Sequence, residues 1–92
     1  MDAATLQSYG YMPRCTIVSA QLKKGANRIK IDLEKSARET VCCPLEPVVT
    51  AKDYKTVTLV GYTVVEGMLV IELMAKAIQS VQITALPFYK YA

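Results

Sequence analysis

The sequence predicts a small all-β protein, an antiparallel β-sandwich or jelly-roll-like domain with an N-terminal arm. Residues 28–34 (RIKIDLE) alternate strictly between charged and apolar side chains, as a strand with one buried face does. Residues 54–65 (YKTVTLVGYTVV) are rich in the β-branched and aromatic side chains that strands favour. Glycines and prolines divide the rest of the chain into short extended segments, which is typical of small antiparallel folds.

The length and composition indicate one domain with apolar surface left over. The chain has 92 residues, of which 52% are hydrophobic and 21% are charged. A chain of this size buries only about two-thirds of its unfolded surface. We therefore expect another copy of the chain, or a larger protein assembly, to cover part of the remaining apolar surface. We divide the chain into an N-terminal arm or short helix at 1–13 and a single β-sandwich domain at 14–92.

The first half of the chain predicts a short helix or arm followed by a hairpin. Asp2 can cap a helix that stops at Gly10. Residues 15–22 (CTIVSAQL) form the next predicted strand, with alternate residues on one buried face. Residues 23–27 (KKGAN) have the length and the glycine of a hairpin turn, so we expect residues 15–22 and 28–34 to pair antiparallel. Residues 35–40 are polar and fit a loop or one helical turn.

The middle of the chain predicts an edge strand and then a second hairpin. Pro44 and Pro47 each lack a backbone donor, so residues 42–51 fit an edge strand or an extended connection. Within residues 54–65, Val57 and Leu59 point to one side, and Gly61 marks a bulge where the alternation shifts. Residues 66–67 (EG) then turn the chain into its next element.

Residues 68–80 (MLVIELMAKAIQS) fit two interpretations. As a strand, the segment places alternate apolar residues on one face; as a helix, it forms a polar stripe through Glu72, Lys76, Gln79 and Ser80. Its composition favours a helix, whereas the tight turn before it and the alternation of residues 81–85 favour a strand. We predict a strand; the alternative is an α+β fold with a helix at about 68–80.

The residue types argue against an enzyme and against a metal or cofactor site. The chain has no histidine, which excludes Ser-His-Asp and Cys-His catalytic arrangements. Cys15, Cys42 and Cys43 lack the CxxC spacing of a zinc site, and we interpret them as small buried residues. The carboxylate pair Asp32 and Glu34 lies on a predicted solvent face beside basic residues. We therefore predict a non-enzymatic protein with no cofactor.

Two groups of side chains are candidates for partner binding. The first is basic and lies in and after the predicted hairpin turn, where it can face an acidic protein or, less favourably, nucleic acid. The second is aromatic and lies near both ends of the chain, and tyrosine is enriched at protein interfaces. The candidate residues are Lys23, Lys24, Arg28, Lys30, Tyr9, Tyr11, Phe88, Tyr89 and Tyr91.

Residues 18–33 (VSAQLKKGANRIKIDL) resemble the strand-LxxGxN-strand hairpins of ligand-binding and immunoglobulin-like sandwiches. As a whole the chain is similar in style to small all-β accessory proteins of virus particles, which implies a structural role. We therefore expect a capsid-decorating or minor structural protein of a virion. The alternatives are a carbohydrate- or cell-surface-binding β-sandwich, and a small α+β nucleic-acid-binding or regulatory domain. Because the chain shows neither a secretory signal nor a membrane span, we expect synthesis in a cytoplasm and incorporation into a particle.

Overall fold

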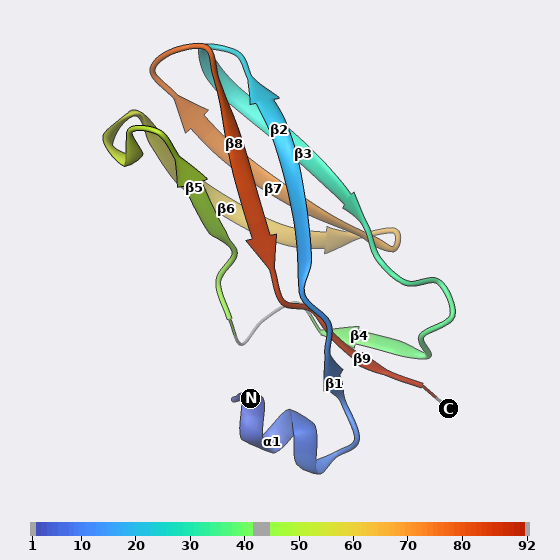
Figure 1. The fold of residues 1–92 in the computed structure, drawn as a ribbon. Helices are drawn as coiled ribbons and strands as arrows, with labels where there is room; N and C mark the ends of the chain where they lie inside the picture. Colours follow the sequence, from blue (N-terminus) through green and yellow to red (C-terminus); the bar gives the residue numbers. More distant parts are fainter. Residues whose placement is uncertain (1, 42–44, 92) are drawn as a thin grey trace.

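The computed structural model describes residues 2–41 and 45–91. Figure 1 shows an elongated molecule with extents of 43 × 23 × 17 Å. The described residues form one helix, one 3-10 turn and nine strands: α1 (Ala3–Ser8), β1 (Met12–Pro13), β2 (Thr16–Leu22), β3 (Gly25–Asp32), β4 (Glu39–Val41), β5 (Val48–Ala51), η1 (Tyr54–Thr56), β6 (Val57–Val65), β7 (Met68–Ala75), β8 (Gln79–Ala85) and β9 (Phe88–Lys90).

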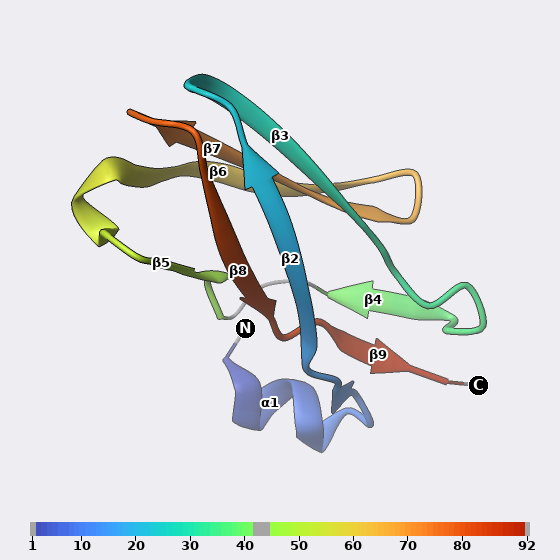
Figure 2. The ribbon, with the colours of Figure 1, turned by 45° about the horizontal axis from the view of Figure 1, so that its top comes forward.

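The strands form three antiparallel sheets of three strands each, ordered β2-β8-β5, β3-β7-β6 and β1-β9-β4. The prediction of an all-β antiparallel fold is confirmed. Its closer assignment to a sandwich or jelly roll stays a prediction. In Figures 1 and 2 the two longer sheets face each other, and the short third sheet lies at one end beside α1.

One hydrophobic core joins the two longer sheets. Alternate residues over 69–75 of β7 and 81–85 of β8, the central strands of the two sheets, point into it and are at most 4% exposed. Leu22 of β2 and Ile31 of β3 add to it from the edge strands. This arrangement follows from the period-2 patterns, since successive side chains of a strand point to opposite faces.

The predicted hairpin between residues 15–22 and 28–34 is wrong. β2 pairs with β8 and β3 pairs with β7, so residues 23–24 carry the chain from one sheet to the other. Asn27 holds this crossover: its side chain accepts a hydrogen bond from the Lys23 amide at 3.0 Å and donates to the Lys23 carbonyl at 2.8 Å. A hairpin and a crossover both place alternate side chains in the core, so the sequence pattern is the same for the two.

The helix alternative for residues 68–80 is also wrong, because this segment contains β7, a crossover and the start of β8. Strand pairing on both sides of β7 overrides the helical composition. The hairpin between β6 and β7 is confirmed. Its turn residues Glu66 and Gly67 have φ values of 51° and 76°, the positive values of a two-residue hairpin turn. The bulge is confirmed as well, since the register shifts between Leu59 and Gly61.

The N-terminal residues form a short helix that lies against the third sheet. The Asp2 side chain accepts a hydrogen bond from the Thr5 amide at 2.8 Å, as the predicted cap requires, and Gly10 has a φ of 90°. Leu6 is 2% exposed although it lies outside the main core. Residues 35–38 form a loop as predicted, whereas residues 39–40 belong to β4, so the loop is shorter than the sequence suggested.

Cys15 is exposed, so its interpretation as a buried residue is wrong. Cys15 lies at the same alternate positions as Ile17 and Ser19 of β2, whose side chains point away from the core. Alternation therefore places the Cys15 side chain on the outside as well. Cys42 and Cys43 lie outside the described residues. β5 is an edge strand, as predicted for the segment that follows Pro47.

Candidate protein interaction surface

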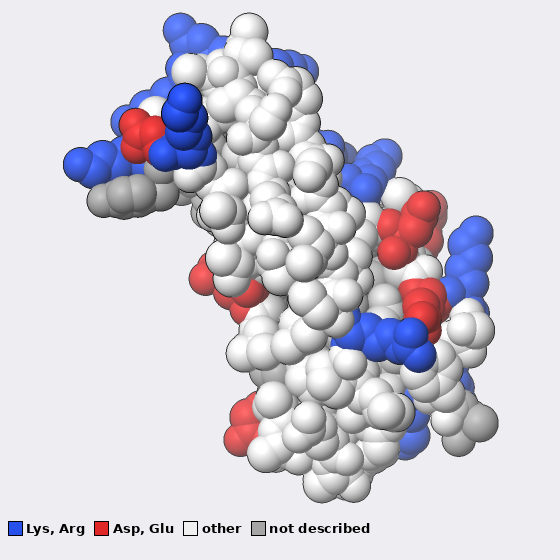
Figure 3. All heavy atoms as spheres, viewed as in Figure 1, with Lys and Arg blue, Asp and Glu red and all other residues white. Residues whose placement is uncertain are grey.

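The outer face of the β2-β8-β5 sheet is uncharged. No residue of these three strands, which the structure describes in full, carries a charge. We name this surface the uncharged face. Its outward side chains are Ile17, Ser19, Gln21, Val48, Thr50, Ser80, Gln82 and Thr84. Figure 3 shows it as a continuous white band over β8 and β2.

The uncharged face has apolar residues at one end and amide side chains along its length. Ile17 and Val48 are both in register with Thr84 and are 57% and 59% exposed. One row further along the strands, Gln82 lies between Ser19 and Thr50. The centres of protein interfaces are depleted in charged residues, whereas ordinary protein surface is not. A sheet face of this composition is therefore suited to contact with another protein.

A basic surface lies at one end of the two longer sheets, β2-β8-β5 and β3-β7-β6. Three connections cross between the sheets there: residues 23–24, 52–56 and 76–78. We name this surface the crossover end, and its lysines are Lys23, Lys24, Lys52, Lys55 and Lys76. The only acid in these connections is Asp53, whose side chain accepts a hydrogen bond from the Lys55 amide at 3.0 Å. Basic side chains, drawn in blue, gather at the top and upper left of Figure 3, where these connections lie.

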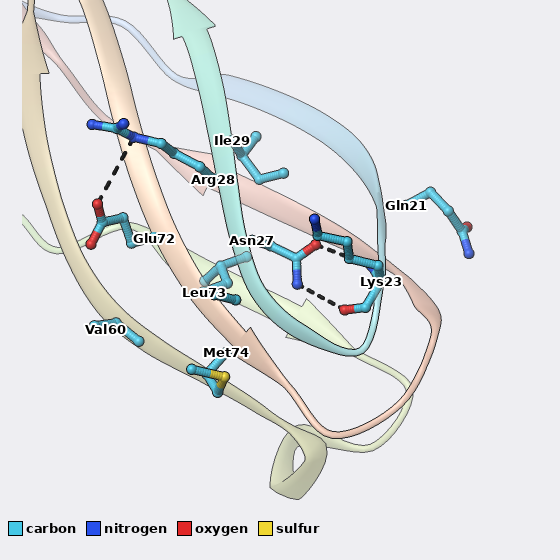
Figure 4. A pocket seen from close by; sticks show the side chains of 10 residues that line it. Gln21, Lys23, Asn27, Arg28, Ile29, Val60, Glu72, Leu73 and Met74 are labelled. Carbon is cyan, nitrogen blue, oxygen red and sulfur yellow. Dashed lines mark hydrogen bonds and ion pairs between the residues drawn. The ribbon is translucent and has the colours of Figure 1, made fainter.

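The two other predicted basic residues, Arg28 and Lys30, lie on the outer face of β3 and are exposed. Arg28 Nε lies 3.9 Å from a carboxylate oxygen of Glu72 on the neighbouring strand, an exposed and therefore weak pair. Beside it is a shallow open groove of about 590 Å³, whose lining includes Val60 and Met74 (Figure 4). Its apolar floor and charged rim fit a side chain of a partner better than an enclosed ligand.

Two of the tyrosines near the ends of the chain, Tyr11 and Tyr91, bind carboxylates of the same chain. The Tyr11 hydroxyl donates to Glu39, and the ammonium of Lys90 lies 5.5 Å from the centre of the Tyr11 ring. The hydrogen bond to Glu39 raises the pKa of Tyr11 above 10.0, because the phenol must stay protonated to donate. These contacts connect the segment after α1 with β4 and β9.

A second cluster surrounds Tyr91. Its hydroxyl donates to Glu34, which raises the pKa of Tyr91 above 10.0, and Arg14 lies 3.5 Å from the other carboxylate oxygen of Glu34. The Arg14 guanidinium is also 5.8 Å from the centre of the Tyr91 ring. Tyr89 lies below, with its ring centre 6.1 Å from that of Tyr91 and its hydroxyl accepting a hydrogen bond from the Glu34 amide at 3.3 Å.

The predicted site residues therefore fall into three groups. Lys23 and Lys24 lie together at the crossover end, and Arg28 and Lys30 follow along β3. Tyr11 and Tyr91 hold the third sheet and its neighbouring loop together, whereas Tyr9 is 59% exposed. Phe88 and Tyr89 are 1% and 2% exposed, so they belong to the interior of the chain and offer no surface to a partner.

Sequence reasoning missed the uncharged face and part of the crossover end. A signal for the face was present: the outward positions of residues 16–22 and 79–85 carry serine, threonine and glutamine where residues 28–34 carry charges. No local signal groups Lys52, Lys55 and Lys76 with the lysines at 23–24, because only the crossovers bring these segments to one end.

Among the described residues, no group of three or more histidine, cysteine, aspartate or glutamate side chains is placed to hold a metal ion. The described part of the chain also has no helix with the length and apolar character needed to cross a bilayer. The comparisons with known proteins find no match: no family model fits the sequence, and no curated protein or solved structure is significantly similar to it.

Proposed function

We propose that this chain is a non-enzymatic structural protein that works by binding other protein surfaces. Its most concrete form is a small virion component, either a capsid-decorating or a minor structural protein. The observation that carries the proposal is the uncharged face, a complete sheet surface without charge in a chain with a net charge of +3. The more specific form rests on the resemblance in style of the sequence to small all-β accessory proteins of virus particles.

The two surfaces have different roles in this proposal. The uncharged face supplies contact area, because burying Ile17 and Val48 is favourable and the hydroxyl and amide groups around them can pair across an interface. The crossover end selects the partner by charge, because its lysines attract an acidic neighbour before contact and disfavour a basic one. Binding is thus expected to become slower with added salt.

The alternative functions have less support. A sugar-binding module needs several exposed aromatic platforms, yet Tyr89 is buried and the hydroxyls of Tyr11 and Tyr91 are bound to glutamates of this chain, which leaves Tyr9 as the exposed one of these four tyrosines. The nucleic-acid-binding or regulatory α+β domain required a helix at about 68–80, and this segment is extended. We therefore keep the structural proposal alone.

Density-gradient sedimentation of tagged chains in the organism that encodes the protein tests the proposal. Gln82→Lys places a charge at the centre of the uncharged face, and Met74→Lys places one on the outer face of β7, the central strand of the opposite sheet. We expect the wild-type chain and Met74→Lys to sediment with large particles, and Gln82→Lys to remain in the light fractions. A wild-type chain found only in light fractions, or Gln82→Lys sedimenting like wild type, would contradict the proposal.

A further inference from the structure

The edge strands of the sheets differ in how well they are protected from pairing with a strand of another chain. Proteins usually blunt an exposed edge with charges, prolines or short strands. β3 carries three charged residues, and β1, β4 and β5 have 2, 3 and 4 residues. β2 is uncharged, but β3 contacts it and the Lys23–Asn27 bonds close one of its ends.

β6 is the longest edge strand, with nine residues, and it contains neither a charge nor a proline. Eight of these nine residues are β-branched, aromatic or leucine in the run VTLVGYTVV, a composition that favours pairing with another strand. Val60, Val64 and Val65 are 60%, 43% and 44% exposed. Among the described strands, β6 is therefore the edge best suited to accept a further strand.

The sequence of β6 is complementary to itself in one antiparallel register. Because the bulge between Leu59 and Gly61 shifts the alternation, the side of the sheet that carries the core has Val57 and Leu59 before the bulge, and Tyr62 and the more exposed Val64 after it. If a two-fold axis between residues 60 and 61 relates the two copies, Val57 of one copy pairs with Val64 of the other, and Leu59 pairs with Tyr62. Antiparallel partners must lie on the same face of a sheet, and this register satisfies that condition.

The charges at the two ends of β6 select the antiparallel direction. Lys55 precedes the strand at the crossover end, and Glu66 follows it in the hairpin turn. In the register above, Lys55 of one copy lies opposite Glu66 of the other, at both ends of the interface. Parallel pairing would instead place the basic crossover ends of two copies side by side, which is unfavourable.

The bulge is the remaining protection on this edge, because a bulge twists a strand and disrupts its ladder. In this register the bulges of two copies meet at the two-fold axis. The side chain of Val60 points outward there, so Val60 of each copy lies near its counterpart. The irregularity then fixes the register instead of preventing pairing.

We propose that β6 pairs antiparallel with β6 of a second copy, which joins two β3-β7-β6 sheets into one continuous sheet. The interface is isologous, as expected for a two-fold dimer. This inference rests on the proposed function and identifies a second copy of the chain as a protein partner. It leaves the uncharged face of each copy accessible.

Light scattering of the purified chain over a range of concentrations tests the pairing. We expect the wild-type mass to approach twice the chain mass of 10.1 kDa. Val64→Lys places a charge on the paired edge and should leave a monomer, whereas Ile17→Lys, on the outer face of β2, should still dimerise. Both sites are 43% or more exposed, and the circular dichroism spectrum checks that each variant is folded.

A charge exchange tests the register itself. Lys55→Glu or Glu66→Lys alone should weaken the dimer roughly tenfold, since each creates like-charge contacts at both ends. An equimolar mixture of the two single variants should form a heterodimer of wild-type affinity, because every end contact is then between opposite charges. Equal affinities for the mixture and the single variants would overturn the register.

Failure of the pairing is distinguishable from failure of the proposed function. A wild-type chain that stays monomeric at its highest soluble concentration overturns the pairing, while sedimentation with particles in the gradient is measured independently. A dimer that Ile17→Lys abolishes and Val64→Lys does not would overturn the pairing through β6 and assign the contact to the uncharged face.

Discussion

Replacing Ile83 with alanine tests whether the two longer sheets depend on one shared core. Ile83 is fully buried in β8, in register with Val18 on one side and Val49 on the other. The change removes three carbon groups, each worth about 0.8 kcal/mol of transfer free energy, or about 2.4 kcal/mol together. The cavity left behind adds to this loss, and we expect a decrease of about 3–4 kcal/mol in the free energy of unfolding.

Ile17→Ala is the matched control, since Ile17 belongs to the adjacent strand but is 57% exposed. Its cost should be about 1 kcal/mol or less, mainly from lost strand propensity. Urea unfolding followed by circular dichroism measures both values, at several protein concentrations because self-association adds to apparent stability. Equal costs for the two substitutions, or a cost under about 1 kcal/mol for Ile83→Ala, would refute the shared core.

Three further measurements follow from single contacts. The pKa values of Tyr11 and Tyr91 are raised above 10.0, so the stability from their hydrogen bonds should be complete below pH 10 and be lost as the pH rises through the pKa values of the folded state. An ultraviolet titration in which no tyrosine has a pKa above 10.0 would contradict this. The Thr5 amide lowers the pKa of Asp2 below 3.8, so the stability from this cap should be present above pH 3.8 and be lost as the pH falls through the pKa of the folded state. At neutral pH, Asp2→Ala should speed amide hydrogen exchange in α1 and Asp2→Asn should not. Equal exchange rates in the two variants would refute the cap. Gly67→Ala should destabilise by about 1–2 kcal/mol because φ is 76°, while Gly61→Ala, with open space around it, should not; equal unfolding midpoints would contradict the turn geometry.

Strands and turns could be predicted from the sequence because their causes are local. Alternating side chains identified β2 and β3, and the EG pair at 66–67 identified the turn before β7. The bulge at Gly61 was visible as a shift in the alternation. Each of these features depends on residues within a few positions of one another.

The pairing of the strands could not be predicted in the same way. β2 and β3 bury the same faces in a hairpin as in a crossover between sheets, so alternation does not distinguish the two. The composition of residues 68–80 favoured a helix, whereas the neighbouring turn and alternation favoured the strand that we predicted. Only the pairing of β7 with β3 and β6 decides that segment.

The candidate surface, like the strand pairing, could be predicted only where its residues are neighbours in the sequence. Lys23 and Lys24 were found because they are adjacent in the sequence, whereas Lys76 joins them only through the fold. The tyrosines were chosen for their residue type, and the contacts of Tyr11 with Glu39 and of Tyr91 with Glu34 link segments far apart in the chain. Residue type alone does not show whether a tyrosine faces a partner or its own chain.

Hydroxyl-radical footprinting of the free and the particle-bound chain would test the role of the uncharged face most directly. Ile17 and Val48 are more than half exposed in the isolated chain and should be labelled there. If the face binds other proteins, both residues should be protected in the assembled particle, while Met74 on the opposite sheet keeps its labelling. Unchanged labelling of Ile17 and Val48 in the particle would contradict the account.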